Sequence, residues 1–300
     1  MKNIIIFGYG IAGIQAHEWL REQEEYHFCG FADNSPYKQG HYVCGKKIIN
    51  MDELIALNKE LDVHVIIGVR RWWELADQCK EQGIKVEGVF YNGRLQSDEH
   101  MEFARLDLSK EIKLYAGDIM DEFHLNEENL FGLSITKSDQ KHIFHNIMNA
   151  YPLPDECIAG YEAEEVLEYI PRERQKFVLD EIYRILKTGS RCRITLPDFN
   201  SPCLKRRIMT DEEGNPLFDP GGGGNYGKDG IENGEVYFPT YEDFSKILSQ
   251  TSFSSVEWLC YHTKDGQLHK KYIDTNNAYN RRVSNETDED VFCIVVDCYK

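Results

Sequence analysis

The chain has 300 residues, of which 28% are charged and 41% hydrophobic, and its formal net charge is -17 at pH 7. This balance is typical of a globular protein large enough for two domains, and it excludes a mainly disordered chain. The negative charge would repel nucleic-acid phosphates, so we expect no nucleic-acid partner.

Strands and helices are predicted to alternate through the first hundred residues. The predicted elements are strand 3–8, helix 11–24, strand 26–33, helix 51–58, strand 63–69, helix 70–82 and strand 84–92. The first turn, IIIFGYGIAG at residues 4–13, places glycines at positions 8, 10 and 13 after an apolar strand. This G-x-G-x-x-G pattern permits a tight turn and lets a pyrophosphate approach the helix N-terminus.

Asp33 ends the second predicted strand, 20 residues after Gly13. An acid at this place binds a ribose hydroxyl in dinucleotide sites. Two alternatives stay open: the glycines could serve only the packing of the turn, and Asp33 could serve only the turn before Asn34 and Pro36.

Four stretches of this part carry a family resemblance: IIIFGYGIAG, GFADNSP, GHYVCGKKIINMDEL and VIIGV. In content and spacing they resemble the small N-terminal Rossmann-like domain of bacterial sugar O- and N-acyltransferases, over residues 1–95. The resemblance implies a pocket for a nucleotide sugar, formed by Gly8, Gly10, Gly13, Asp33 and Asn34. The hexapeptide repeats of those acyltransferases are missing from this sequence, so acyl transfer is not implied.

A polar stretch at residues 96–110 is predicted to link this domain to a second one at residues 111–300. The second domain again alternates, with predicted segments at 112–118, 130–135, 141–147, 157–170, 172–187, 191–197 and 291–300. The helix 172–187 is expected to stop at Thr188-Gly189 with a glycine cap. The basic stretch CLKRRIM at 203–209 is expected to be a solvated helix face.

The second half resembles class I S-adenosylmethionine (SAM)-dependent methyltransferases, particularly those of polysaccharide gene clusters. The resemblance is carried by LPDECIAGY, LEYI, LKTGS and LPD, and it continues through FDPGGGGNYG, YFPTYEDFSKIL and VFCIVVDCYK. It covers about residues 110–300. It implies an α/β protein with two Rossmann-like domains, the second a class I methyltransferase-like sheet with SAM as cofactor.

The cofactor positions that the resemblance implies are Gly117, Asp118, Ser134, Thr136, Asn146 and Ile147. Several depart from the family pattern. Only Gly117 remains of the glycine-rich loop, Ser134 or Thr136 stands where an acid usually binds the ribose, and Tyr169 replaces the usual histidine of LEHI. A domain that has lost methyl transfer therefore stays an alternative.

A base for a sugar hydroxyl would help methyl transfer, and Asp198 is the first candidate because it ends the strand RITLPD. His262 and Tyr226 are candidates for contacts to the acceptor. The run Gly221, Gly222, Gly223 and Gly224 is expected to be a lid over the acceptor, with a mobile linker as the alternative. Asp198 could instead only terminate its strand, and His262 could be structural.

The predicted function is SAM-dependent methylation of a sugar, nucleotide sugar or related surface-polysaccharide precursor. The alternative is a binding protein that recognises nucleotides or nucleotide sugars without catalysis. A nicotinamide-dependent oxidoreductase ranks last because no hydride-transfer constellation is recognisable.

Other features of the sequence concern the setting of the protein. No apolar run reaches the roughly 18 residues of a membrane helix, and no signal peptide is recognisable at the N-terminus. The nine cysteines show no zinc-like spacing, so we expect reduced, mostly buried thiols and no metal site. We expect a cytoplasmic protein without a membrane partner, and the oligomeric state, including a homo-oligomer, stays open.

Overall fold

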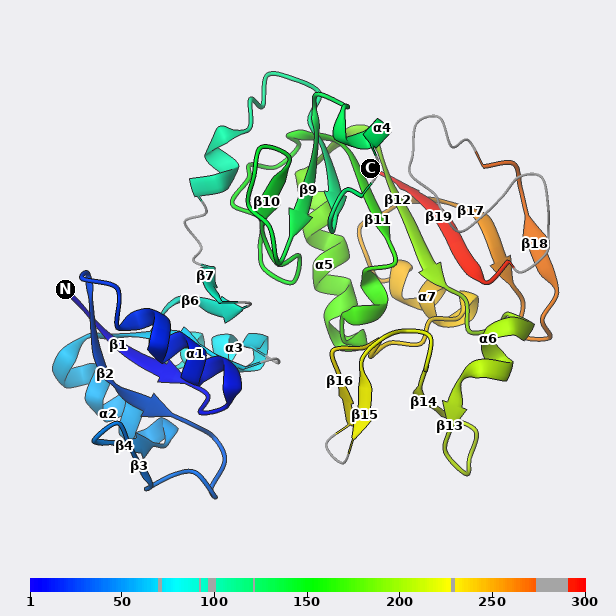
Figure 1. Cartoon of the computed structure of the whole chain (residues 1–300). Helices are drawn as coiled ribbons and strands as arrows, with labels where there is room; N and C mark the ends of the chain where they lie inside the picture. Colours follow the sequence, from blue (N-terminus) through cyan, green and yellow to red (C-terminus); the bar gives the residue numbers. More distant parts are fainter. Residues whose placement is uncertain (70–71, 92, 97–100, 121, 228–229, 274–290) are drawn as a thin grey trace. The chain divides into compact units, whose positions relative to one another are not determined.

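The computed structural model describes residues 1–69, 72–91, 93–96, 101–120, 122–227, 230–273 and 291–300. The chain forms two compact units, Met1–Met101 and Glu102–Lys300, each with its own sheet (Figure 1). The boundary falls inside the segment 96–110 that is predicted to be a linker. The second part of that segment is not a linker, however, because Phe103 and Leu106 are buried in the hydrophobic core of the second unit.

The first unit is built on a seven-stranded sheet with the order β3-β4-β2-β1-β5-β6-β7. Its strands are β1 (Lys2–Phe7), β2 (Tyr26–Ala32), β3 (Tyr42–Val43), β4 (Lys46–Ile49), β5 (Val63–Ile67), β6 (Lys85–Tyr91) and β7 (Arg94–Gln96). The five inner strands are parallel, and the edge strands β3 and β7 are antiparallel to their neighbours. The apolar run of β1 is almost fully buried, so it forms the centre of the sheet.

Three helices connect these strands: α1 (Ile11–Leu20), α2 (Met51–Leu61) and α3 (Trp72–Glu81). α2 begins with a capping box, in which Asn50 and Glu53 each accept the backbone N–H of the other. The prediction that the first helix continues to residue 24 is wrong. It ends at Leu20, and the acidic residues 22, 24 and 25 that follow would be unfavourable at the negative end of a helix dipole. The other predicted elements of this unit end within three residues of the observed ones.

The second unit contains an eight-stranded sheet with the order β10-β9-β8-β11-β12-β19-β17-β18. Its strands are β8 (Lys113–Ala116), β9 (Leu130–Ser134), β10 (His142–Phe144), β11 (Ile158–Glu164), β12 (Leu186–Pro197), β17 (Ser255–His262), β18 (Leu268–Lys270) and β19 (Cys293–Tyr299). The first five strands in this order are parallel, and β19 is antiparallel to both of its neighbours. The strand order reverses between β8 and β11, which is the place where open α/β sheets bind ligands. The protein is thus an α/β protein with two mixed, mostly parallel sheets, as predicted.

The longest helix of the second unit is α5 (Arg172–Ile185), which buries Val178, Leu179, Ile182 and Ile185 completely. The predicted stop at Thr188-Gly189 is wrong, because α5 ends at Ile185 and the chain enters β12 at once. Gly189 has a φ of +80° within an irregularity of the β11–β12 pairing, and its N–H donates to the Lys300 carbonyl at 2.8 Å. The glycine therefore serves a strand irregularity and not a helix cap.

The connections between the first three parallel strands of this unit are short. Only the single turn α4 (Glu122–Leu125) lies between β8 and β9, and residues 135–141 and 145–157 contain no helix. By contrast, α5 separates β11 from β12, and α7 (Tyr241–Leu248) precedes β17 (Figure 1). The connections on either side of β9 and β10 are therefore mostly loops.

Two small hairpins extend away from the sheet after α6 (Pro202–Arg207) (Figure 1). They are formed by β13 (Met209–Thr210) with β14 (Pro216–Phe218), and by β15 (Asn225–Gly227) with β16 (Gly230–Glu232). The basic residues of α6 are exposed, in agreement with the predicted solvated face.

None of the helices in the described part of the chain has the length and apolar character needed to cross a membrane. All nine cysteines are free thiols, and six of them are buried, as expected. Within the described ranges, no group of three or more histidine, cysteine or acidic side chains could hold a metal ion.

Candidate functional site

The glycine turn after β1 contains two kinds of glycine. A Cβ on Gly13 would lie 1.9 Å from the Gly8 carbonyl oxygen, and Gly8 itself has a φ of +105°. Gly68, which follows β5, also packs closely against Gly13, because its Cβ would lie 2.7 Å from the Gly13 Cα. A Cβ on Gly10 would meet nothing within 4 Å. Packing therefore accounts for Gly8 and Gly13, whereas the space beside Gly10 at the start of α1 is open.

Asp33 is buried beside this turn, and its carboxylate is already bound by the chain. Oδ2 accepts the N–H of Tyr9 at 2.7 Å and the Lys38 ammonium at 3.1 Å, while Oδ1 accepts the N–H of Ser35 at 2.8 Å. Asn34 is exposed and donates to Gln78 at 3.0 Å. Asp33 thus ties the glycine turn to the loop after β2, a structural role that would have to be relaxed for a ribose to bind.

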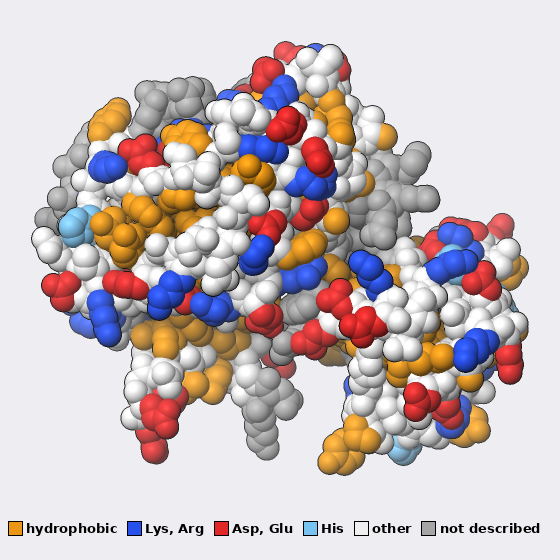
Figure 2. All heavy atoms as spheres, turned by 180° about the vertical axis from the view of Figure 1, so that it is seen from behind, with side chains coloured by type: hydrophobic (Ala, Val, Ile, Leu, Met, Phe, Trp, Pro, Cys, Tyr) orange, Lys and Arg blue, Asp and Glu red, His pale blue; other side chains and the backbone are white. Residues whose placement is uncertain are grey.

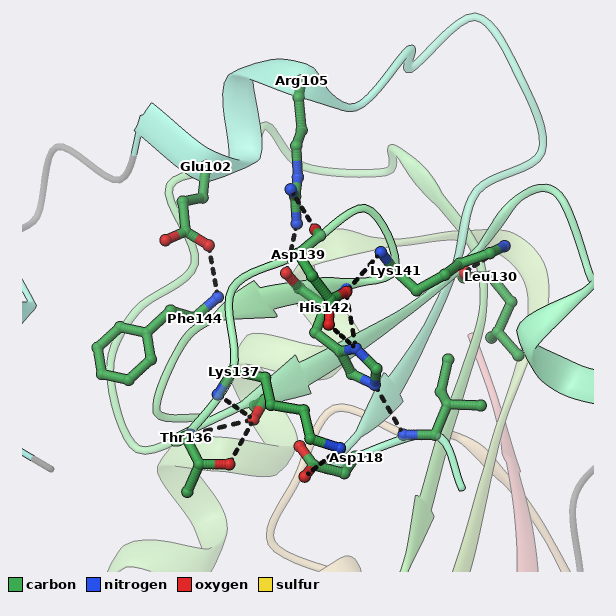
Figure 3. A network of polar contacts seen from close by, with 12 residues as sticks. Glu102, Arg105, Asp118, Leu130, Thr136, Lys137, Asp139, Lys141, His142 and Phe144 are labelled. Carbon is green, nitrogen blue, oxygen red and sulfur yellow. Dashed lines mark hydrogen bonds and ion pairs between the residues drawn. The ribbon is translucent and has the colours of Figure 1, made fainter. Parts of the chain in front are cut away.

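In the second unit, the loops after β8 and β9 are held together by polar contacts (Figure 3). Lys137 lies 3.0 Å from the Asp118 carboxylate. The Ser134 hydroxyl accepts the N–H groups of Thr136 and Lys137 at 3.0 and 2.8 Å. Burial raises the pKa of Asp118, but hydrogen bonds from Ser134 and Lys137 and the charges of Lys137 and His142 outweigh it, so that this pKa lies below its usual value. The position that is predicted to bind the ribose thus lies in a turn whose polar groups already hydrogen-bond to one another.

His142 connects the edge strand β10 to the loop after β8, and the sequence analysis did not identify it. Its buried ring contacts Asp139 through Nδ1 at 2.9 Å, and Nε2 accepts the N–H of Ile119 at 3.1 Å (Figure 3). Because Nε2 accepts a hydrogen bond, Nδ1 carries the proton and donates to Asp139. A Cβ on Gly132 would lie 2.7 Å from the His142 ring, so Gly132 makes room for it.

The 3-10 helix η1 (Met101–Arg105) covers the outer edge of β10. Arg105 donates to the carbonyls of Asp139 and His142, and the Glu102 carboxylate accepts the N–H of Phe144 at 2.6 Å (Figure 3). These bonds engage backbone groups of an edge strand that would otherwise be open to pairing with another chain. The first residues of the second unit therefore cover the outer edge of its sheet.

Asn146 and Ile147, which the resemblance places beside adenine, have structural contacts of their own. The Asn146 side-chain oxygen accepts the N–H of Met148 at 3.0 Å, and Ile147 belongs to the hydrophobic core. Gly117 is different, because its φ is +109° and the nearest atoms to a Cβ there would be 3.6 and 3.7 Å away. A Cβ on Gly117 would thus make ordinary van der Waals contacts with Val166 and Tyr115, and its left-handed backbone is what favours glycine.

Asp198 and His262, 64 positions apart in the chain, meet at the carboxyl end of β12. The Asp198 carboxylate accepts the Nδ1–H of His262 at 2.9 Å and its backbone N–H at 2.6 Å. Asp198 is fully buried and His262 is 4% exposed. Within the described part of the chain, the His262 Nε2 atom makes no hydrogen bond, so it keeps a lone pair.

A further layer of polar contacts holds this pair in place. The N–H of Asn200 donates to Asp198 Oδ1 at 3.0 Å, and its side-chain amide donates to Glu242 at 2.6 Å and to the His262 carbonyl at 3.2 Å. Glu242, in the first turn of α7, also accepts the N–H of Lys264 at 3.1 Å. The strand ends of β12 and β17 and the start of α7 thus fix the imidazole in one orientation.

The four-glycine run packs against charged groups. A Cβ on Gly221 would lie 2.3 Å from the Arg207 guanidinium carbon, and one on Gly222 would lie 2.3 Å from the Glu235 carboxyl carbon. Arg207 in turn binds the buried Asp219 with two hydrogen bonds. Close packing is therefore a structural reason for Gly221 and Gly222, and the role of the run as an acceptor lid stays a prediction.

Two tyrosines lie near this run. The Tyr169 hydroxyl donates to the Gly222 carbonyl at 3.2 Å, so the residue that replaces the usual histidine contacts the glycine run. Gly223 has no neighbour within 4 Å of a Cβ, and a Cβ on Gly224 would lie 2.3 Å from the Glu232 carbonyl oxygen. Tyr226 is 45% exposed and stacks on Phe218 with ring centroids 5.9 Å apart, so it is accessible to a ligand.

Comparisons with known proteins found distant structural likeness only. No protein-family model matches the sequence, and a search of curated proteins found no match. A SAM-dependent methyltransferase from Archaeoglobus fulgidus is 16% identical with a TM-score of 0.40, covering 68% of this chain and 95% of that one. A SAM-dependent methyltransferase from Thermotoga maritima, described as a possible histamine N-methyltransferase, is 14% identical with a TM-score of 0.37, covering 68% and 90%. A Rex-family repressor is 14% identical with a TM-score of 0.26, covering 45% and 54%. Likeness at this level identifies no activity.

Proposed function

We propose that the protein is a SAM-dependent methyltransferase that acts on a hydroxyl group of a sugar, nucleotide sugar or related surface-polysaccharide precursor. The observation that carries the proposal is the buried Asp198–His262 pair at the carboxyl end of β12. Ligands of open α/β sheets bind at this end of the strands. The sequence resemblance over residues 110–300 supplies the cofactor and the class of acceptor. In this proposal the first unit binds the nucleotide part of the acceptor beside Gly10.

Around β8, the backbone fits SAM better than the side chains do. Gly117 has no side chain that would stand between its backbone and a polar group of a ligand, and the Asp118 carboxylate is 29% exposed. The Ser134 hydroxyl and the Ile119 N–H, however, already have partners within the chain. Gly117 and Asp118 would therefore hold the cofactor, and the loop after β9 would have to exchange hydrogen bonds. When bound, SAM supplies a methyl group on a sulfonium, which is already a good leaving group.

The Asp198–His262 pair can accept the proton of the acceptor hydroxyl. Because Nδ1 donates to Asp198, the lone pair is on Nε2, which takes the proton as the hydroxyl oxygen becomes methylated. Asp198 fixes the tautomer and stabilises the imidazolium that forms. Burial of both residues keeps the pair away from bulk water, and Asn200 keeps the carboxylate in place. His262 is thus the proposed base, and Asp198 is a positioning residue.

The test is transfer of a labelled methyl group from SAM to a panel of nucleotide sugars by the full chain. For H262Q we expect the rate to fall by about 100-fold to 10,000-fold, because a general base contributes this much. For D198N we also expect a lower rate. In addition, we expect the pH profile of this variant to lose the dependence that a single base gives. H41Q changes an exposed histidine of the first unit and should retain full activity. Transfer by H262Q at the wild-type rate would refute the role of this pair.

A second candidate, binding of a nucleotide or nucleotide sugar without catalysis, is favoured by the internally bonded loops after β8 and β9. If this candidate is right, thermal unfolding will shift with nucleotide sugars but not with SAM or S-adenosylhomocysteine. A ligand at a hundred times its dissociation constant stabilises by about 2.7 kcal/mol, which such a measurement detects. A shift with SAM and S-adenosylhomocysteine, together with methyl transfer, would exclude the second candidate.

A further inference from the structure

A stack of aromatic rings lies on the face of β17 and β18 that α7 covers. Tyr241, the first residue of α7, stacks on Tyr261 of β17 with ring centroids 4.0 Å apart and planes inclined by 16°. Tyr261 stacks in turn on His269 of β18, which lies directly opposite in the antiparallel pairing, at 5.0 Å and 7°. Trp258 contacts Tyr241 edge to face at 4.8 Å. The three parallel rings therefore form one continuous stack, held from the side by a fourth.

This stack lies at a surface hollow. The hollow has a volume of about 390 Å³ and is lined by Val256, Glu257, Trp258, Leu259, Tyr261, His269, Lys270 and Lys271. Figure 2 shows hydrophobic side chains gathered on the surface of the second unit seen from this side. The volume is at the lower end of the range of small-ligand pockets, so a ligand of one or two rings would fit.

Part of the stack has no obvious role in the core. Trp258 and Tyr261 pack partly against the hydrophobic core of the unit, which explains their rings. His269 is exposed and extends the stack outward on a three-residue edge strand, away from that core. A ring at this position gains little from burial, so it points to a contact made by its outer face.

The hollow also has a polar rim. Glu257 and Lys271 form an ion pair at 3.1 Å, and their side chains are 47% and 60% exposed. The Lys271 N–H donates to the Leu259 carbonyl at 2.8 Å, which fixes the chain after β18 across the end of the hollow. A carboxylate and an ammonium side by side offer hydrogen-bond acceptors and donors to a neutral ligand without selecting for net charge.

The hollow is separate from the proposed base. Tyr261 and His262 are consecutive in β17, so their side chains point to opposite faces of the sheet. His262 binds Asp198 on one face, while Tyr261 stacks on Tyr241 on the other. A ligand in the hollow would therefore not occupy the position beside the His262 Nε2 atom.

We propose that this hollow is a saccharide-binding site, in which a sugar ring packs on the aromatic stack and its hydroxyl groups bond to Glu257 and Lys271. The C–H groups on one face of a sugar ring are apolar with small positive partial charges, and they pack well on the negative face of an aromatic ring. A polyanionic ligand is disfavoured, because the chain has a net charge of -17 and Lys271 of the rim is paired with Glu257. The rings are already stacked, so little side-chain entropy is lost on binding. The site would hold a carbohydrate whether or not a methyl group is transferred.

Calorimetric titration of the full chain with maltohexaose, cellohexaose and xylohexaose tests the proposal in the absence of SAM. We expect binding of at least one of these neutral oligosaccharides, weakened about tenfold in H269A, because one ring contact contributes on the order of 1 kcal/mol. H269W keeps a ring at this position and should bind at least as well as the wild type. H41A removes an exposed histidine of the first unit and should bind unchanged.

The proposal is overturned if none of the three oligosaccharides binds, or if H269A binds them as the wild type does. Binding that is lost in both H269A and H269W would also overturn it, because the ring itself would then not be the contact. His269 is exposed, so these variants are expected to fold, and their thermal unfolding provides the check. The titration contains no methyl donor. A negative result would therefore not bear on the proposed methyl transfer, which has its own test.

Discussion

The turn after β1 and the loop after β8 occupy equivalent places in the two units, yet they are built differently. Each follows a central strand of a parallel sheet at its carboxyl end. In the first unit the turn enters the ten-residue helix α1, and Gly10 leaves open space at its start. In the second unit the loop enters the four-residue α4, and Asp118 and Ile119 are bound by Lys137 of the loop after β9 and by His142 of β10.

The difference shows what a following helix does for a glycine turn. In the first unit, the packing of Gly8 and Gly13 and the Asp33 carboxylate, which accepts the Tyr9 N–H, keep the turn tight, while the first N–H groups of the following helix can remain available. Where the helix is one turn long, Lys137 and His142 take over the task of holding the loop, and they use its polar groups to do so. Among the described residues of the second unit, one nitrogen with an available lone pair lies on the other side of the switch point, at Nε2 of His262.

The largest expected effect is a loss of stability when a packed glycine is substituted. It tests the difference between the packed glycines of the turn and the open one. G13A places a methyl group 1.9 Å from the Gly8 carbonyl oxygen, so the backbone of the turn must move. We expect the first unit to lose about 3 kcal/mol or more, because overpacking against backbone cannot be relieved by a rotamer change. Chemical denaturation, followed by a probe for each unit, measures this loss.

G10A is the matched control for that variant. A Cβ there meets nothing within 4 Å, and the φ of -138° is accessible to alanine. We expect a change within about 1 kcal/mol, the usual size of a change at a helix N-cap. Equal destabilisation by G10A and G13A would contradict the division into packed and open glycines.

The second prediction concerns the closed loop of the other unit. H142L removes the acceptor of the Ile119 N–H and the donor to Asp139, so a buried N–H loses its partner. We expect a loss of about 1–3 kcal/mol in the second unit and faster hydrogen exchange at Ile119, with exchange in the first unit unchanged. H41L in the first unit is the control. If Ile119 exchanges at the wild-type rate, His142 does not hold the loop.

Local patterns predicted the central strands and the longer helices α1, α2, α3 and α5, because these depend on periodicity and turns within a few residues, whereas the short edge strands β3, β7 and β18 and the hairpins after α6 were not predicted. The apolar run of β1 and the capping box of α2 are such signals. The end of α5 was missed because Gly189 satisfies a strand irregularity as well as it would a helix cap. Sequence spacing does not distinguish these two uses of a left-handed glycine.

The candidate site depends on contacts between residues that are distant in the sequence. Such contacts are harder to predict from the sequence. Asp198 and His262 were each recognised as candidates, but their pairing is a product of strand order, with β17 placed beside β19 and β19 beside β12. His142 was not recognised, because a histidine in an apolar strand carries no local signal of its partners. Arg105 was assigned to a linker, although it binds the edge of β10.

The smallest expected effect is the pH dependence of the Asp118–Lys137 contact, which closes the loop of the second unit as the Asp33–Lys38 contact ties the turn of the first. Burial raises the pKa of Asp118, and the bonds from Ser134 and Lys137 lower it further than burial raises it, so the folded pKa is below the unfolded value of about 3.9. A depressed carboxyl pKa contributes stability above the unfolded pKa and loses it as the pH falls through the folded pKa.

The difference in unfolding free energy between the wild type and D118N isolates this contribution. We expect it to be constant above about pH 5 and to shrink as the pH is lowered through about 4. Its size should be below about 1 kcal/mol, because the lysine of the pair is 42% exposed and solvent screens the contact. K137M should remove most of the same pH-dependent part, since it takes away one of the groups that depress the pKa. A difference that grows as the pH falls would mean that Asp118 is not held in its charged form, and the loop would then be closed by His142 alone.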